Sequence, residues 1–194
     1  MESLTLSTII KRLASKNLPL FCLNELGGVL GSNNRQSLYK RIQRLSKSGI
    51  LQNLMKGKYL FTLKDTNDFT ISNFLCYPSY VSLQSALSFH NIITAFSYQI
   101  TGITIKKSKH LLINEKDYSY SKIDTKLFWG FEKKEDFLIA TPEKALLDYV
   151  YFASKGLVNL DWDEIDMTNL DKKLLLKWAR MYNKTVFQEI KKHI

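Results

Sequence analysis

The chain has little cysteine, no long hydrophobic run and no basic leader. Cys22 and Cys76 are far apart, and neither belongs to a CxxC pair, which argues against a disulfide framework and a zinc site. No run approaches the roughly 20 apolar residues that a membrane helix needs. The N-terminal segment MESLTLSTIIKRL carries an acid where a secretory signal has bases. We therefore expect a soluble, cytoplasmic protein without a metal or a cofactor.

Acidic residues are also missing from one long stretch. Between Glu25 and Asp65 there are eight lysines and arginines and no acid. Residues 1–75 carry 11 bases and 4 acids, a net charge of +7, whereas residues 76–194 carry 17 bases and 14 acids, a net charge of +3. Solvated helix faces usually mix charges of both signs, so this stretch indicates a polyanionic partner.

The basic stretch contains a predicted helix over residues 34–48, which Ser32, Asn33 or Asn34 can cap. Leu38, Ile42 and Leu45 recur at helical spacing and predict a buried stripe. Polar and basic residues occupy the remaining surface and are candidate DNA contacts, since Gln can bind adenine and Arg or Lys can bind guanine or phosphate. These candidates on the helix are Arg35, Gln36, Ser37, Lys40, Arg41, Gln43, Arg44 and Lys47. The alternative is an ordinary solvated basic face.

The flanking segments favour a winged helix-turn-helix. Helices are predicted over residues 4–17 and 21–30, and two apolar runs, residues 50–54 and 59–63, predict a hairpin after the basic helix. Lys56 and Lys58 lie at its turn, and with Tyr59 they are expected to hold the hairpin against phosphate. The basic helix would then enter the major groove.

The sequence after the hairpin predicts a second domain. We therefore expect an α+β protein with a winged helix over residues 1–70 and a mixed α/β domain over residues 74–194. Residues 62–73 are polar and predict a linker. A helix capped by Ser82 is followed by strand-like runs, which short connections arrange in a mainly antiparallel sheet. Thr141, Pro142 and Glu143 predict a helix start. That helix runs to residue 156, and a further helix over 170–182 precedes a basic tail. The strand-like runs cover residues 98–105, 111–113, 118–123, 127–131 and 137–140.

The predicted winged helix and three segments of this second domain, taken together in this order, resemble a known family. The three segments are YPSYVSLQSALSFHNII (77–93), ITGITIKK (100–107) and LFWGF with IATPEKALLDYVYF (127–152). Together they resemble the AbiEi antitoxins of type IV toxin–antitoxin systems, which act in abortive infection and phage defence. The resemblance implies a winged helix that binds inverted repeats in its own promoter and represses its operon. It also implies a C-terminal domain that counteracts a nucleotidyltransferase toxin, without requiring direct contact with the toxin.

Alternatives remain. The chain could be a stand-alone winged-helix regulator, or a module that binds protein or RNA without a toxin partner. Asp117 or Asp124 with Glu132 and the lysines after it loosely resembles a metal-dependent nuclease site, but such triplets are frequent in lysine-rich chains. The acidic run over residues 161–166 fits a turn anchored by Trp162 better than a cation site.

No catalytic constellation stands out from the sequence, and we expect no enzyme activity. The three histidines are scattered along the chain, and the sequence has no Gly-rich phosphate loop. Glu143 is expected to interact with the dipole of its helix, and Lys144 is expected to face solvent.

Overall fold

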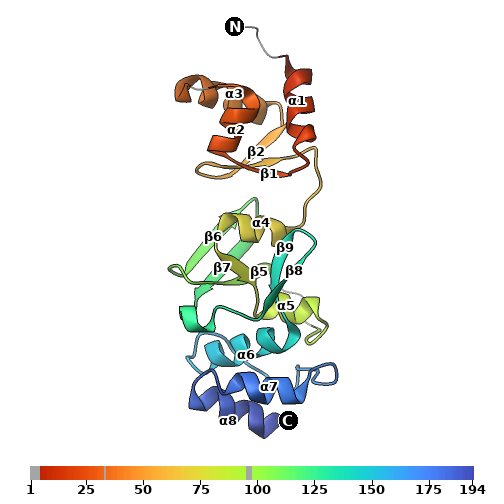
Figure 1. Cartoon of the computed structure of the whole chain (residues 1–194), viewed down its shortest axis with the longest axis vertical. Helices are drawn as coiled ribbons and strands as arrows, with labels where there is room; N and C mark the ends of the chain where they lie inside the picture. Colours follow the sequence, from red (N-terminus) through yellow and green to blue (C-terminus); the bar gives the residue numbers. More distant parts are fainter. Residues whose placement is uncertain (1–4, 33, 95–97) are drawn as a thin grey trace. The chain divides into compact units, whose positions relative to one another are not determined.

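The computed structural model describes residues 5–32, 34–94 and 98–194. It is an α+β protein whose chain divides into two compact units (Figure 1). The N-terminal unit is Met1–Asn67 and the C-terminal unit is Asp68–Ile194. The division falls inside the polar stretch that we expected to be a linker over residues 62–73. That stretch is not all linker, because a helix begins at Asp68 and buries Ile71 and Leu75.

The N-terminal unit combines three helices with a three-stranded antiparallel sheet of order β1-β3-β2. Its elements are α1 (Leu6–Ser15), β1 (Leu20–Cys22), α2 (Leu23–Leu30), α3 (Arg35–Lys47), β2 (Leu51–Met55) and β3 (Lys58–Phe61). Side chains from all three helices and from the sheet form one apolar core. Among them, Leu13, Leu26 and Leu30 are completely buried. The helices therefore depend on one another and on the sheet for their stability.

The second helix begins two residues later than expected. The sequence predicted a helix over residues 21–30, but Phe21 lies in β1, where it is opposite Tyr59 of β3. Both side chains are buried in the core. Apolar residues alone do not distinguish a short buried strand from the first turn of a helix, and the pairing with β3 settles the choice. Gly31 ends α2 in the left-handed conformation, with φ of 60°.

The C-terminal unit consists of a six-stranded sheet with helices packed on it. Its helices are α4 (Asp68–Leu75), α5 (Gln84–Phe89), α6 (Pro142–Ala153), α7 (Lys172–Ala179) and α8 (Lys184–His193), with a 3-10 turn, η1 (Thr125–Leu127). Its strands are β4 (Ser79–Val81), β5 (Gln99–Thr104), β6 (Lys109–Ile113), β7 (Lys116–Lys122), β8 (Phe131–Lys134) and β9 (Phe137–Ala140). Ser82 does not cap α5, because Leu83 occupies the N-cap position.

The sheet is mixed, and antiparallel pairs form its majority. Its order is β6-β7-β5-β4-β9-β8, and the β5–β7 and β4–β9 pairs are parallel. The other three pairs are antiparallel. Strand β6 follows β5 after a short connection but pairs with β7 and not with β5. Strand β4, which was not anticipated, lies near the centre of the sheet and is buried along its whole length.

Helix α6 is the central helix of this unit, and α7 and α8 pack against it (Figure 1). Its predicted start is confirmed: Thr141 Oγ1 accepts a hydrogen bond from the Lys144 N–H, and Pro142 occupies the first turn. The basic tail that the sequence suggested is instead helix α8, which buries Val186 and Ile190. Within the described part of the chain, no helix combines the length and the apolar character needed to cross a membrane.

Candidate nucleic-acid interface

Helix α3 has the cap and the buried stripe that its sequence predicts. Asn34 is the N-cap, and its side-chain oxygen accepts hydrogen bonds from the Gln36 and Ser37 N–H groups at 2.8 and 3.2 Å. Ser32, the other described candidate, is buried and donates to the Asn34 carbonyl, while Asn33 lies outside the described residues. The apolar stripe, Leu38, Ile42 and Leu45, is buried as expected. The helix is thus anchored along one side only.

The side of α3 opposite this stripe is polar and basic. Gln36, Lys40, Gln43 and Lys47 are all exposed there, as the helical spacing requires. Arg35 and Arg44 are exposed beside them, and Ser37 is half-buried. None of the lysines and arginines of α3 takes part in an ion pair formed within the described residues. Their positive charge is therefore not neutralised by neighbouring carboxylates.

Arg41 differs from the other basic residues of this helix. It is half-buried, and its Nη1 donates a hydrogen bond of 2.6 Å to the Leu30 carbonyl at the end of α2. Cations are stabilised near the C-terminal end of a helix by the carbonyls that have no partner within the helix. Arg41 therefore joins α2 to α3 and holds the basic helix in place, although the sequence made it a candidate for phosphate.

A concave surface of about 670 Å³ adjoins the N-terminal half of α3. The turn before the helix and the exposed side of α3 line it together. The lining residues are Gly31, Ser32, Asn34, Gln36, Ser37, Lys40, Arg41 and Arg44. Three of these side chains are basic and none is acidic, so this surface can accept an anion next to the first turns of α3.

The β2–β3 hairpin supplies the other candidate contacts. Lys56 is exposed at the turn, where Gly57 adopts a φ of 77° that suits glycine. Lys58 is half-buried at the start of β3, opposite Cys22 of β1. Tyr59 cannot contact phosphate as expected, because its side chain is 3% exposed and belongs to the core. Of the three hairpin candidates, Lys56 is thus the one whose side chain is exposed.

Sequence reasoning missed a buried charged cluster in the C-terminal unit. Lys144 and Asp148, one turn apart on α6, form an ion pair and are fully buried. Lys144 Nζ also donates to Tyr182 Oη at 2.6 Å, and Asp148 accepts further hydrogen bonds from Tyr80, Ser82 and Tyr182 at 2.8–2.9 Å. The expectation that Lys144 faces solvent was wrong, because Tyr80, Trp129 and Tyr182 surround its side chain.

Lys144 Nζ and both carboxylate oxygens of Asp148 have hydrogen-bond partners within this cluster. Burial lowers the pKa of Lys144, and the negative charge of Asp148 opposes that effect. The Lys144 ammonium also lies 5.0 Å from the centre of the Trp129 ring. A signal was present in the sequence: after Glu143, Lys144 and Asp148 are the charged residues of a helix that is otherwise aliphatic or aromatic, and they lie four residues apart. Buried charges occur in pairs, and Asp148 supplies the counter-ion that the buried Lys144 requires.

The structure does not bring the nuclease candidates together. Asp117 lies in β7 and Glu132 in β8, and three strands separate them, which corresponds to about 19 Å at the usual strand spacing. The Asp117 Oδ1 atom lies 3.0 Å from His110 Nε2. Glu132 forms an ion pair with Lys134 of the same strand. The Asp124 carboxylate accepts the Lys126 N–H and thereby caps η1.

The described residues contain no group of three or more potential metal ligands. In the acidic run, the Asp161 and Asp166 carboxylates accept backbone N–H groups within their own turns. Trp162 packs against the core and stacks on His193, with ring centres 3.9 Å apart. The run is therefore an anchored turn, as its sequence favoured.

A comparison with protein-family models finds no match for this chain, and no curated protein resembles it significantly.

Proposed function

We propose that the N-terminal unit binds double-stranded DNA through α3 and that the protein regulates transcription. Its order of elements, α1-β1-α2-α3-β2-β3, with a small antiparallel sheet, supports a winged helix-turn-helix. In that arrangement the third helix enters the major groove and the hairpin lies against the backbone. The observation that carries the proposal is the exposed side of α3, which is basic, free of acids and rich in side chains that bind bases.

The residues of this side divide into two roles. Gln36 and Gln43 are exposed and offer the paired donor and acceptor that match adenine in the major groove. Lys40, Arg44 and Lys47 are exposed cations that bind phosphate or guanine, and Lys56 of the hairpin adds a phosphate contact. The α3 residues that line the concave surface would contact the phosphate backbone of one DNA strand.

The decisive experiment measures the binding of a labelled duplex from upstream of this protein's own gene. Neutralising about five phosphates gives a slope of about −4.5 in a plot of log affinity against log salt. Affinity would then fall several hundred-fold from about 50 to 200 mM salt, by the same relation. Binding that does not depend on salt would rule out this mode.

The double variant Lys40→Ala, Arg44→Ala tests the choice of helix. It should abolish specific binding while thermal unfolding stays unchanged, because both side chains are exposed. The matched control is Lys191→Ala, Lys192→Ala, which removes the same charge from exposed positions on α8. Normal binding by the α3 variant would show that another element contacts DNA.

A narrower proposal concerns the operon: the protein represses its own promoter and counteracts a nucleotidyltransferase toxin. The sequence segments that resemble AbiEi antitoxins support it. Residues from two of those segments form one buried cluster, in which Tyr80 and Ser82 bind Asp148. The segments thus act as parts of one folded unit. Because their most distinctive residues are buried, the residues that oppose a toxin would lie elsewhere on this unit.

The test co-expresses the chain with the nucleotidyltransferase encoded beside its gene. Rescue of growth by the wild type, and by a chain lacking residues 1–67, supports an antitoxin whose activity lies in the C-terminal unit. DNA binding without rescue instead supports the alternative, a stand-alone regulator. Rescue without DNA binding favours a module that binds protein or RNA.

A further inference from the structure

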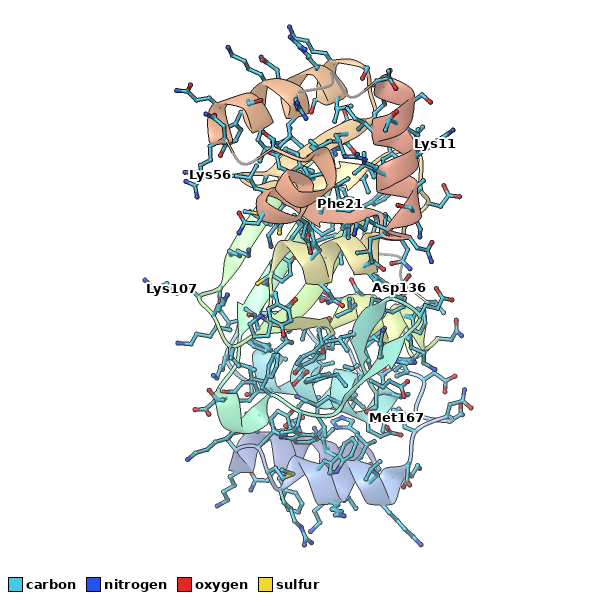
Figure 2. All side chains as sticks on the ribbon, turned by 45° about the horizontal axis from the view of Figure 1, so that its top comes forward. Lys11, Phe21, Lys56, Lys107, Asp136 and Met167 are labelled. Atoms are coloured by element: carbon cyan, nitrogen blue, oxygen red, sulfur yellow. The ribbon has the colours of Figure 1, made fainter. Side chains whose placement is uncertain are left out.

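The β5–β6 connection gathers lysines at one corner of the C-terminal unit. Lys106 and Lys107 follow β5, and Lys122 ends β7, where it is opposite Thr104 of β5. The Lys122 N–H donates to Ser108 Oγ at 2.9 Å, and the Lys106 N–H donates to Thr104 Oγ1 at 3.2 Å. These hydrogen bonds fix the backbone that carries the lysines. Figure 2 shows Lys107 at the end of the connection, where its side chain points away from the unit.

An exposed tyrosine lies at the same corner. Ser79 of β4 is opposite Thr104 of β5, and Tyr77 precedes the start of β4 by two residues. Thr104 Oγ1 also donates a hydrogen bond of 2.7 Å to the Pro78 carbonyl, which holds the two segments together. The Tyr77 side chain is 74% exposed, so its ring is accessible. We call Tyr77, Lys106, Lys107 and Lys122 the corner surface.

The charges of the corner surface have no partners among the described residues. Its three lysines are exposed and take part in none of the ion pairs formed there. The nearest acid along the chain, Asp124, accepts the Lys126 N–H. Lys109, in contrast, is tied into the fold by a hydrogen bond of 3.0 Å to the Leu75 carbonyl.

We propose that the corner surface binds a single-stranded nucleic acid, a function separate from the duplex binding proposed for α3. The lysine ammonium groups would contact successive phosphates, and an unpaired base would stack on the Tyr77 ring. In duplex DNA the bases are already paired and stacked, so an exposed tyrosine has no base face to contact. Recognition of unpaired bases on aromatic side chains is characteristic of RNA and of single strands in general.

The experiment uses the full-length chain carrying Lys40→Ala and Arg44→Ala, so that α3 contributes little binding. The probe is a fluorescein-labelled 15-nucleotide oligouridylate, followed by fluorescence anisotropy at low salt. Adding Lys106→Ala and Lys107→Ala should lower affinity about 10-fold or more. The salt slope should become shallower by about 1.4, since each phosphate contact on a single strand contributes about 0.7.

Tyr77 gives a second readout that charge alone would not change. Tyr77→Ala should lower affinity about 10-fold because the stacked base loses its partner, whereas Tyr77→Phe should keep it within about twofold. Lys191→Ala with Lys192→Ala is the matched control and should change affinity less than twofold. Circular dichroism of each variant verifies that the fold is intact.

The outcomes separate the possible ligands. Oligothymidylate bound as well as oligouridylate identifies a surface for any single strand, and preference for oligouridylate identifies RNA; both support the proposal. Absence of oligouridylate binding, equal loss in the α8 control, or losses confined to a 15-base-pair duplex would overturn it. In the chain with an intact α3, the corner-surface variants should bind upstream duplex DNA normally, so this proposal and that for α3 can fail separately.

Discussion

Helices α3 and α6 both carry charged residues one turn apart, but in different environments. Each carries a lysine with a charged residue four positions later: Lys40 with Arg44 on α3, and Lys144 with Asp148 on α6. The α3 pair is exposed and like-charged, whereas the α6 pair is opposite in charge and completely buried. The role of a lysine in this chain is therefore decided by what packs against it.

The difference has an energetic basis. Two like charges on an exposed face repel slightly, at a few tenths of a kcal/mol, and gain when a phosphate lies between them. A buried lysine must be compensated in place, and the Asp148 carboxylate does this while accepting hydrogen bonds from three further hydroxyls. The α3 charges thus remain available to a partner outside the protein, whereas the α6 charges compensate each other inside the C-terminal unit.

Among the substitutions that test this difference, Asp148→Ala should change stability most. It leaves the Lys144 ammonium buried without its counter-ion, which should lower the free energy of unfolding by about 3–5 kcal/mol. Urea denaturation followed by tryptophan fluorescence measures it, since all three tryptophans lie in the C-terminal unit. Asp117→Ala, which removes a half-buried carboxylate paired with His110 near the surface, is the control and should change stability by less than about 1 kcal/mol.

Replacing the pair together separates charge from packing. Lys144→Met with Asp148→Leu should recover part of the stability that Asp148→Ala loses, because no charge then remains buried. If Asp148→Ala lowered the free energy of unfolding no more than Asp117→Ala does, the buried Lys144 would not need Asp148 as its counter-ion.

High pH should destabilise the C-terminal unit. Burial raises the pKa of Tyr80 and of Tyr182 well above 10.0, and the Asp148 charge raises both further. Above pH 10 these tyrosines lose protons in the unfolded chain but keep them in the folded one, so stability falls as pH rises. The lowered pKa of Lys144 acts in the opposite direction, but for one group only.

Urea midpoints measured between pH 8 and 11 test this expectation. The double variant Tyr80→Phe, Tyr182→Phe removes both titrating groups and should show a shallower decline above pH 10. The same decline in both proteins would mean that groups outside the cluster control the pH dependence.

Gly130→Ala tests how closely Lys144 is packed. Gly130 has a φ of 71°, and an added Cβ would lie 3.0 Å from Lys144 Cγ. We expect a loss of about 2–4 kcal/mol, from left-handed strain together with overpacking. Gly156→Ala is a matched control, since its φ is 68° but its added Cβ meets nothing within 4 Å. The difference between the two variants measures the packing around Lys144, and equal losses would argue against it.

The smallest expected effect lies within α3. Arg41→Ala should lower the stability of the N-terminal unit by about 1 kcal/mol because the Leu30 carbonyl loses its donor. Lys40→Ala should leave stability within about 0.5 kcal/mol. Hydrogen exchange of the α2 and α3 amides reports on this unit alone. A strong loss of DNA binding in Arg41→Ala, with unchanged exchange, would place Arg41 among the DNA contacts.

Features set by neighbours along the chain were predictable. The Leu38, Ile42 and Leu45 stripe and the exposed side of α3 follow from helical periodicity, and capping rules narrowed the cap to three candidates, of which Asn34 is the one used. The start of α6 at Thr141 and Pro142 follows from the same rules. Each of these features depends on residues no more than a few positions apart.

Features set by distant segments were not predictable. Phe21 is in a strand because β3, nearly forty residues later, pairs with it. Arg41 is held by the end of α2, and the parallel pairs of the sheet join strands separated by other elements. Local patterns carry no information about such partners.

By itself the sequence determined the charge of the N-terminal unit, the position of its basic helix and the side of that helix that faces solvent. Only the tertiary structure decided which charges remain available to a partner. It buried Lys144 among Tyr80, Trp129 and Tyr182 and bound Arg41 to the end of α2. The physical reason is that solvation controls the free energy of a charge, and solvation depends on what the whole chain places around it.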